Sequence, residues 1–168
     1  MDIHQELISE FDREVATTRK MLAAVPADAD FAWKPHTKSM TLGRLAGHVA
    51  ETAGEWAIST LTKEKLEFQK DHKFEPYVPA STAAMLAKFE EQTKLAKETL
   101  ENLPIDKWDQ NWKFIFGDQT WINGSKYEVW RTWVVDHLIH HRAQLGVYLR
   151  LLDKPIPGSY GPSADDSF

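Results

Sequence analysis

Two histidines four positions apart have the clearest potential for chemistry in this 168-residue chain. His137 and His141 lie in a stretch with helical periodicity. Because a helix advances about 100° per residue, their rings would project from one side, one turn apart. Trp133 and Tyr148 share that side, which we therefore expect to be buried. Neutral imidazole is a ligand for zinc, nickel, copper and iron, and a pair at this spacing can present its nitrogens to one ion.

A third histidine, His48, lies beside Leu45 and Val49 on the apolar side of a separate helical stretch. Burying a polar group without a partner costs about 1–3 kcal/mol, so three imidazoles that converge in a core require an explanation. One divalent metal ion bound by His48, His137 and His141 supplies it. Three protein ligands leave a coordination position free, which is more typical of catalytic than of structural sites. The alternative is that these histidines are satisfied in the core or exposed.

The other histidines are weaker candidates. His140 lies off the line of the pair, and we expect it at the surface, near Asp136, or in contact with a ligand. Solvation is expected for those in polar or terminal contexts, namely His4, His36 and His72.

Two glutamates follow His48 on its helical stretch. Glu51 and Glu55 lie about one and two turns after it, so either could orient an imidazole or relay a proton. The alternative is that both are solvated. Trp133 and Tyr148 could form the wall of an apolar substrate pocket, or they could simply belong to the core.

A bound dication would lower the pKa of a thiol or of a water molecule. Three hypotheses follow: a metal-dependent enzyme that transfers a thiol, a metal-dependent hydrolase, and a non-catalytic metal-binding or stress-associated protein. The chain has no cysteine, which fits the first hypothesis, since the sulfur would arrive with a cosubstrate. Disulfides and thiolate ligands are excluded.

Apolar residues at helical spacing predict four helices. Their approximate ranges are 2–24, 41–61, 81–103 and 125–152, with two long linkers rich in proline and polar residues between the first three. Trp112–Phe116 and Gln119–Ile122 could form a short hairpin or an irregular cover. No sheet is otherwise indicated. The sequence thus predicts one all-α domain over 1–168, a four-helix bundle with long connections and an irregular tail, 153–168.

Charge and hydropathy limit the partners. The net charge is −5 and no basic stripe is present, so nucleic acid is not an expected partner. No apolar run is long enough to span a bilayer, and the charged N-terminus does not resemble a signal peptide. We expect a cytoplasmic protein with a small-molecule substrate.

Three segments resemble a known family. They are the stretch Leu42–His48 (LGRLAGH), the stretch Asp136–Leu145 (DHLIHHRAQL) and the tail Pro157–Asp165 (PGSYGPSAD). Several residues of the first linker add to the resemblance: Asp30-Phe31, Pro35 and Ser39-Met40. Together they resemble the DinB-like (DinB/YfiT) superfamily over essentially the whole chain.

The resemblance implies an up-down-down-up four-helix bundle with a metal triad of His48, His137 and His141. It also implies zinc or nickel as the ion, with iron or others as alternatives, and a homodimer. The best understood members are transferases or isomerases that use low-molecular-weight thiols such as bacillithiol or mycothiol. Many others have no known activity, so the resemblance implies a site and not a substrate.

Overall fold

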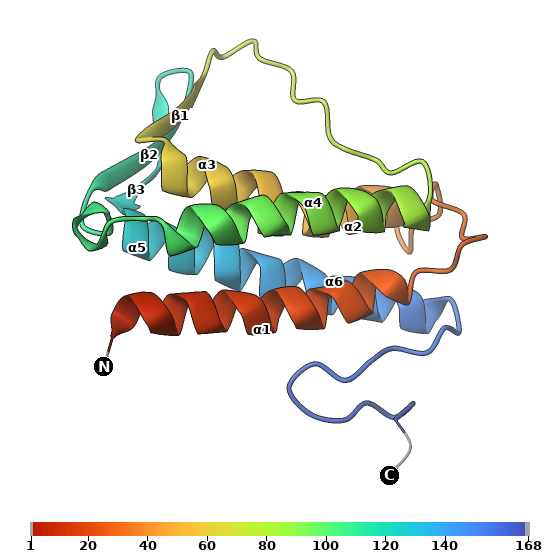
Figure 1. Ribbon diagram of the computed structural model, residues 1–168. Coiled ribbons are helices and arrows are strands. Elements are labelled where there is room, and N and C mark those ends of the chain that lie inside the picture. Colours follow the sequence, from red (N-terminus) through yellow and green to blue (C-terminus); the bar gives the residue numbers. More distant parts are fainter. Residues whose placement is uncertain (1, 167–168) are drawn as a thin grey trace.

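Four helical rods lie side by side in the computed structural model of this chain, which describes residues 2–166 (Figure 1). Met1, and residues 167 and 168 of the expected tail, lie outside the described residues. The rods are α1 (Ile3–Ala23), α2 with α3 (Leu42–Glu51, Ala57–Thr62), α4 (Thr82–Glu101), and α5 with α6 (Lys126–Val129, His137–Leu151). The first and last rods run in one direction and the other two in the opposite direction.

Two of the rods contain a π-helical segment. Thr52–Trp56 (η1) joins α2 to α3, and Trp130–Asp136 (η3) joins α5 to α6. Such segments insert an extra residue into the helical turn, change the side to which later residues point, and occur often at functional sites. Each segment here lies within a few residues of a histidine of the predicted triad.

Side chains at the helix starts satisfy the free N–H groups of the first turn. The Asp2 carboxylate accepts hydrogen bonds from the N–H groups of His4 and Gln5, and the Ser81 hydroxyl accepts one from Ala84. Ser125 and Glu128 cap α5 reciprocally. These local signals explain where the helices begin.

The core lies between the rods. It combines aliphatic and aromatic side chains that are almost fully buried, among them Leu7, Phe11, Leu22, Leu45, Val49, Met85, Phe89, Trp130, Leu138 and Leu145. A second, smaller cluster of Trp112, Phe114 and Val129 lies at one end of the bundle.

A three-stranded mixed sheet forms that end (Figure 1). β1 (Lys65–Phe68) pairs in parallel with β2 (Asn111–Phe116), and β2 pairs with β3 (Gln119–Ser125) in a hairpin. Gly117, with a φ of 57°, forms its turn, a conformation that glycine adopts without steric cost. Ile105–Lys107 is a short 3-10 turn (η2) ahead of the sheet.

The prediction of an all-α fold was therefore wrong. Of the two alternatives weighed for the aromatic segment, the hairpin is present. The sequence pattern did not indicate the strand β1, because β1 has only four residues and lies in a charged linker. It also pairs with residues such as Phe114 that are distant in sequence. Periodicity in a short window does not reveal a strand whose partner is non-local.

Candidate metal centre

Three histidines from two rods meet inside the bundle. His48 comes from α2, and His137 and His141 come from the first two turns of α6. One ring nitrogen from each lies within 4.8 Å of the others, and Nε2 of His48 is 3.0 Å from Nε2 of His137. Ligands of one ion at about 2.0–2.1 Å are separated by only a few ångströms. The three rings therefore lie close enough together to hold a metal ion.

Close packing of the second linker holds α2 at this position. A Cβ atom added to Gly47 would lie 2.4 Å from the carbonyl oxygen of Tyr77, and one on Gly43 would lie 2.9 Å from Cβ of Phe31. Only glycine allows the two linkers to approach the helix this closely. The neighbouring His48 is 5% exposed, with the rings of Trp56, His137 and His141 packed against it.

Two tryptophans from the π-helical segments form an aromatic wall beside the triad. The rings of Trp56 and Trp133 are stacked, with centroids 4.6 Å apart and planes at 10°. The centroid of His137 lies 5.1 Å from that of Trp56 and 5.2 Å from that of Trp133. Trp133 thus lies at the site as an aromatic neighbour of a ring. The role of Trp56 was missed, because the π-helical turn that aims it has no sequence signal.

The electrostatics of the site favour neutral imidazoles. Burial, followed by the charges of neighbouring histidines, lowers the pKa of His137 from 6.5 to about 4. Burial and then the charge of His48 lower the pKa of His141, also to about 4. At neutral pH both rings are therefore unprotonated at one nitrogen, which is the form that binds metal ions.

Glu51 lies next to the triad. Its Oε2 atom accepts a hydrogen bond from Arg44 at 2.8 Å and lies 3.7 Å from Nδ1 of His48. Its Oε1 atom accepts one from the N–H of Tyr77 at 3.1 Å. Burial, the largest single influence, raises the pKa of Glu51, but the nearby ring of His48, the hydrogen bond and charge of Arg44, and the N–H of Tyr77 together lower it below its ordinary value. Glu51 is therefore an anion that faces a triad ring.

Glu55 lies in a different environment. Its side chain is exposed and forms an ion pair with Lys88 at 2.8 Å. The structure therefore does not bring Glu55 into the triad, although the two glutamates are one turn apart. The π-helical turn that contains Glu55 changes the direction of its side chain.

Nδ1 of His48 lies near both a donor and an acceptor, so the ring can carry its proton on either nitrogen. Arg44, which can only donate, lies 3.4 Å from this nitrogen, and Glu51, which can only accept, lies 3.7 Å from it. With Nδ1 as acceptor, Nε2 of His48 can donate to His137. With Nδ1 protonated, Nε2 offers its lone pair to an ion.

A cavity of about 370 Å³ reaches the site from the side of α6. His141, Gln144 and Tyr148 are among the residues that line it, and the Tyr148 phenol donates to the carbonyl oxygen of Met40 at 3.1 Å. Lys38 lies at the rim. The cavity gives a small molecule access to His141.

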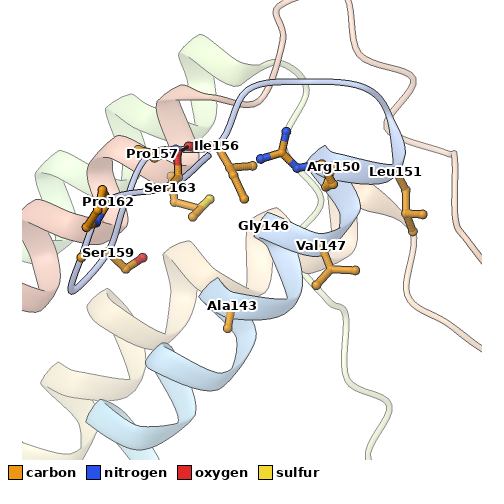
Figure 2. A pocket seen from close by; sticks show the side chains of 13 residues that line it. Ala143, Gly146, Val147, Arg150, Leu151, Ile156, Pro157, Ser159, Pro162 and Ser163 are labelled. Carbon is orange, nitrogen blue, oxygen red and sulfur yellow. Dashed lines mark hydrogen bonds between the residues drawn. The ribbon is translucent and has the colours of Figure 1, made fainter. Parts of the chain in front are cut away.

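A second cavity, of about 450 Å³, lies between α6 and the C-terminal tail (Figure 2). Apolar side chains such as Ile156 and Val147 line it, and its one charged residue, Arg150, is paired with Asp165. None of the triad histidines lines this cavity, so it is separate from the candidate metal centre.

The remaining histidines do not join the triad. His140 is exposed and contacts Gln144 rather than Asp136. His4 is half-buried and accepts a hydrogen bond from Trp108 at 3.3 Å, contrary to the expected solvation. Within residues 2–166, the only group of three potential ligands with metal-site spacing is His48, His137 and His141. Three neutral nitrogen donors without a competing cysteine or carboxylate fit a divalent transition-metal ion.

The fold and this site define a bundle protein with a histidine triad, and comparisons place it in a family. The model of the DinB family matches residues 1–167, so the chain belongs to the DinB family. The uncharacterized protein YrdA of Bacillus subtilis is 25% identical over 159 residues, which cover 95% of this chain and 89% of YrdA.

Two solved structures share the fold. A DinB-like protein of Bacillus cereus has a TM-score of 0.70 at 20% identity, with 93% of this chain and 97% of that chain covered. The DinB-like protein YjoA of Bacillus subtilis has a TM-score of 0.67 at 17% identity, with 92% and 96% covered. These similarities confirm the resemblance seen in the sequence.

None of the helices in residues 2–166 combines the length and the apolar character that crossing a bilayer requires.

Proposed function

We propose that this protein is a metal-dependent enzyme that joins a low-molecular-weight thiol to a second small molecule. His48, His137 and His141 would bind one divalent ion. The observation that carries the proposal is the approach of three ring nitrogens from two rods to within 4.8 Å of one another, with one of the three residues, His141, lining an open cavity.

Zinc or nickel is the ion we propose, because neutral imidazole suits both; iron is the alternative. When bound, such an ion supplies positive charge that favours the deprotonated form of a thiol or a water molecule. Three protein ligands leave room for a substrate atom.

The residues around the triad would hold it and admit substrate. Glu51, fixed by Arg44 and by the N–H of Tyr77, would orient the ring of His48. The cavity wall around Tyr148 and Met40 would exclude bulk water from one side of the substrate. The ammonium group of Lys38 at the rim would attract an anionic group, such as the carboxylate of a glutathione-like thiol.

The reaction is a nucleophilic substitution at carbon, with the thiol sulfur as the nucleophile. The sulfur forms a bond to an electrophilic carbon of the second substrate, and the bond between that carbon and its leaving group breaks. The electron pair of the broken bond leaves with the leaving group, and the thiol proton passes to solvent. Because the chain has no cysteine, the sulfur must belong to the cosubstrate.

The alternative functions are a metal-dependent hydrolase and a non-catalytic metal-binding protein. Hydrolysis usually requires a general base near the attacked bond. The described residues that line the cavity at His141 include no aspartate or glutamate, and Glu51 is engaged by Arg44. This favours thiol transfer over hydrolysis. The open cavity favours an enzyme over a storage site.

Turnover assays on protein purified without an affinity tag test the proposal. Metal-loaded protein should conjugate bacillithiol or glutathione to an electrophile, and protein treated with a chelator should lose the activity and regain it with zinc or nickel. Hydrolysis of esters or amides without thiol conjugation would select the hydrolase. Bound metal without any turnover would select the non-catalytic alternative.

A further inference from the structure

A glutamine bridges two histidines on the surface of α6. Nδ1 of His141 lies 2.8 Å from Oε1 of Gln144, one turn later on the same helix. Nε2 of Gln144 lies 3.0 Å from Nε2 of His140. Both contacts have ordinary hydrogen-bond lengths.

The chemistry of the amide gives each contact a direction. An amide oxygen only accepts and an amide nitrogen only donates. In this orientation of the amide, Nδ1 of His141 carries the proton and donates it to Gln144, and Nε2 of His140 accepts from the amide. In a neutral ring only one nitrogen is protonated, so Nε2 of His141 keeps a free lone pair.

The opposite orientation of the amide would remove that lone pair. The amide nitrogen would then donate to Nδ1 of His141, and the proton of the neutral ring would move to Nε2. A protonated Nε2 cannot bind a metal ion.

We propose that Gln144 is a positioning residue, which fixes the tautomer and the ring orientation of His141 so that Nε2 is available to a metal ion. This inference rests on the metal site of the proposed function. His48 differs in this respect, since a donor, Arg44, and an acceptor, Glu51, both lie near its Nδ1 and neither tautomer is singled out. In metal sites, the groups that hold the far nitrogen of a histidine affect metal affinity strongly.

Two substitutions separate the hydrogen bond from the packing of the side chain. Gln144→Leu has a similar volume and no acceptor, whereas Gln144→Glu keeps an acceptor towards His141. Because Gln144 is exposed, water can replace part of its function, and we expect the low end of the usual range: about a tenfold rise in the zinc dissociation constant for Gln144→Leu. Gln144→Glu should bind zinc at least as tightly as the unsubstituted protein.

Gln5→Leu is the matched control, because it removes another exposed helical glutamine far from the triad. Its zinc affinity should be unchanged. Circular dichroism checks that all variants stay folded. Equal zinc affinity of Gln144→Leu and the unsubstituted protein would overturn the inference, and so would a Gln144→Glu protein as impaired as Gln144→Leu.

A metal-free measurement keeps the inference distinct from the proposed function. The ¹⁵N chemical shifts of His141 at neutral pH report which ring nitrogen carries the proton. We expect protonation at Nδ1 in the unsubstituted protein and a mixture of tautomers in Gln144→Leu. Protonation at Nε2 in the unsubstituted protein would contradict the inference whether or not zinc binds. Failure of the unsubstituted protein to bind any metal would instead contradict the proposed function.

Discussion

At the scale of single residues, the site contains two bases, His137 and His141, that burial keeps unprotonated at neutral pH. The pKa of His137 and that of His141 are each about 4, mainly because the rings are buried. In the unfolded chain an exposed histidine titrates near its ordinary value of about 6.5. This difference links the protonation of the triad to stability.

The metal-free protein should lose stability as the pH falls from about 6.5 to about 4. In that window the unfolded chain binds more protons at His137 and His141 than the folded chain, so the free energy of unfolding decreases with decreasing pH. Above pH 7 neither ring titrates in either state. Urea unfolding at pH 7 and pH 5 measures the loss, and His137→Gln, which cannot titrate, should lose less. An equal loss in both proteins would refute this account.

Glu51 and Glu55 form a natural pair for testing the role of the carboxylate. Glu51→Gln should weaken metal binding about tenfold, because it removes the anion that faces Nδ1 of His48. Glu55→Gln should have no effect on metal affinity, since Glu55 is paired with Lys88 at the surface. Titration with zinc distinguishes them. Equal effects of the two substitutions would show that the position of Glu51 beside the ring is unimportant.

At the scale of the elements, helical spacing predicts on which side of its helix each triad histidine lies. It does not predict that His48, His137 and His141 meet. Leu45 and Val49 are buried beside His48 as their spacing indicates. The contact between His48 and His137 joins positions 89 residues apart, and such packing depends on long-range structure that a local pattern does not contain. The π-helical turns are hidden for the same reason: they place Trp56 against Trp133 and turn Glu55 away.

The two helical glycines Gly47 and Gly146 should respond oppositely to alanine. A Cβ at Gly47 would lie 2.4 Å from the carbonyl oxygen of Tyr77, a backbone atom that cannot easily move, so Gly47→Ala should destabilise the fold by about 1–3 kcal/mol. A Cβ at Gly146 would lie 3.5 Å from Cε of Met21, an ordinary contact. Gly146→Ala should therefore stabilise the fold by about 0.5–1 kcal/mol through helix propensity.

Urea unfolding of both variants measures these effects. A Gly47→Ala protein as stable as Gly146→Ala would contradict the close approach of the second linker to α2. Because that linker also supplies the N–H of Tyr77 to Glu51, we expect Gly47→Ala to weaken metal binding as well.

At the scale of the whole molecule, the sheet closes one end of the bundle and the tail crosses its outer face (Figure 1). A polar network that includes a buried ion pair attaches the tail. Arg142 forms an ion pair with Glu14 at 2.7 Å, and the hydroxyl of Tyr160 accepts from Arg142 at 2.6 Å and donates to Glu14 at 2.8 Å. The ion pair joins α1 to α6 directly, and the tail is attached to both helices through Tyr160. The expected homodimer stays a prediction.

Tyr160→Phe should loosen the tail without disturbing the ion pair. It removes the hydroxyl that is hydrogen-bonded to Arg142 and to Glu14, so we expect a loss of about 1 kcal/mol in the free energy of unfolding. Cleavage of the tail by a protease should become faster. Tyr127→Phe, on the surface of α5, is the matched control. Unchanged cleavage in Tyr160→Phe would show that the network does not hold the tail.

The central claim, that three imidazoles from two rods share one ion, is tested most directly by the metal content of histidine variants. Elemental analysis of protein purified without an affinity tag should find about one divalent ion per chain in the unsubstituted protein and in His72→Ala, whose exposed ring lies outside the triad. His48→Ala, His137→Ala and His141→Ala should each be folded and nearly free of metal. Full metal content in any of these three would contradict the claim.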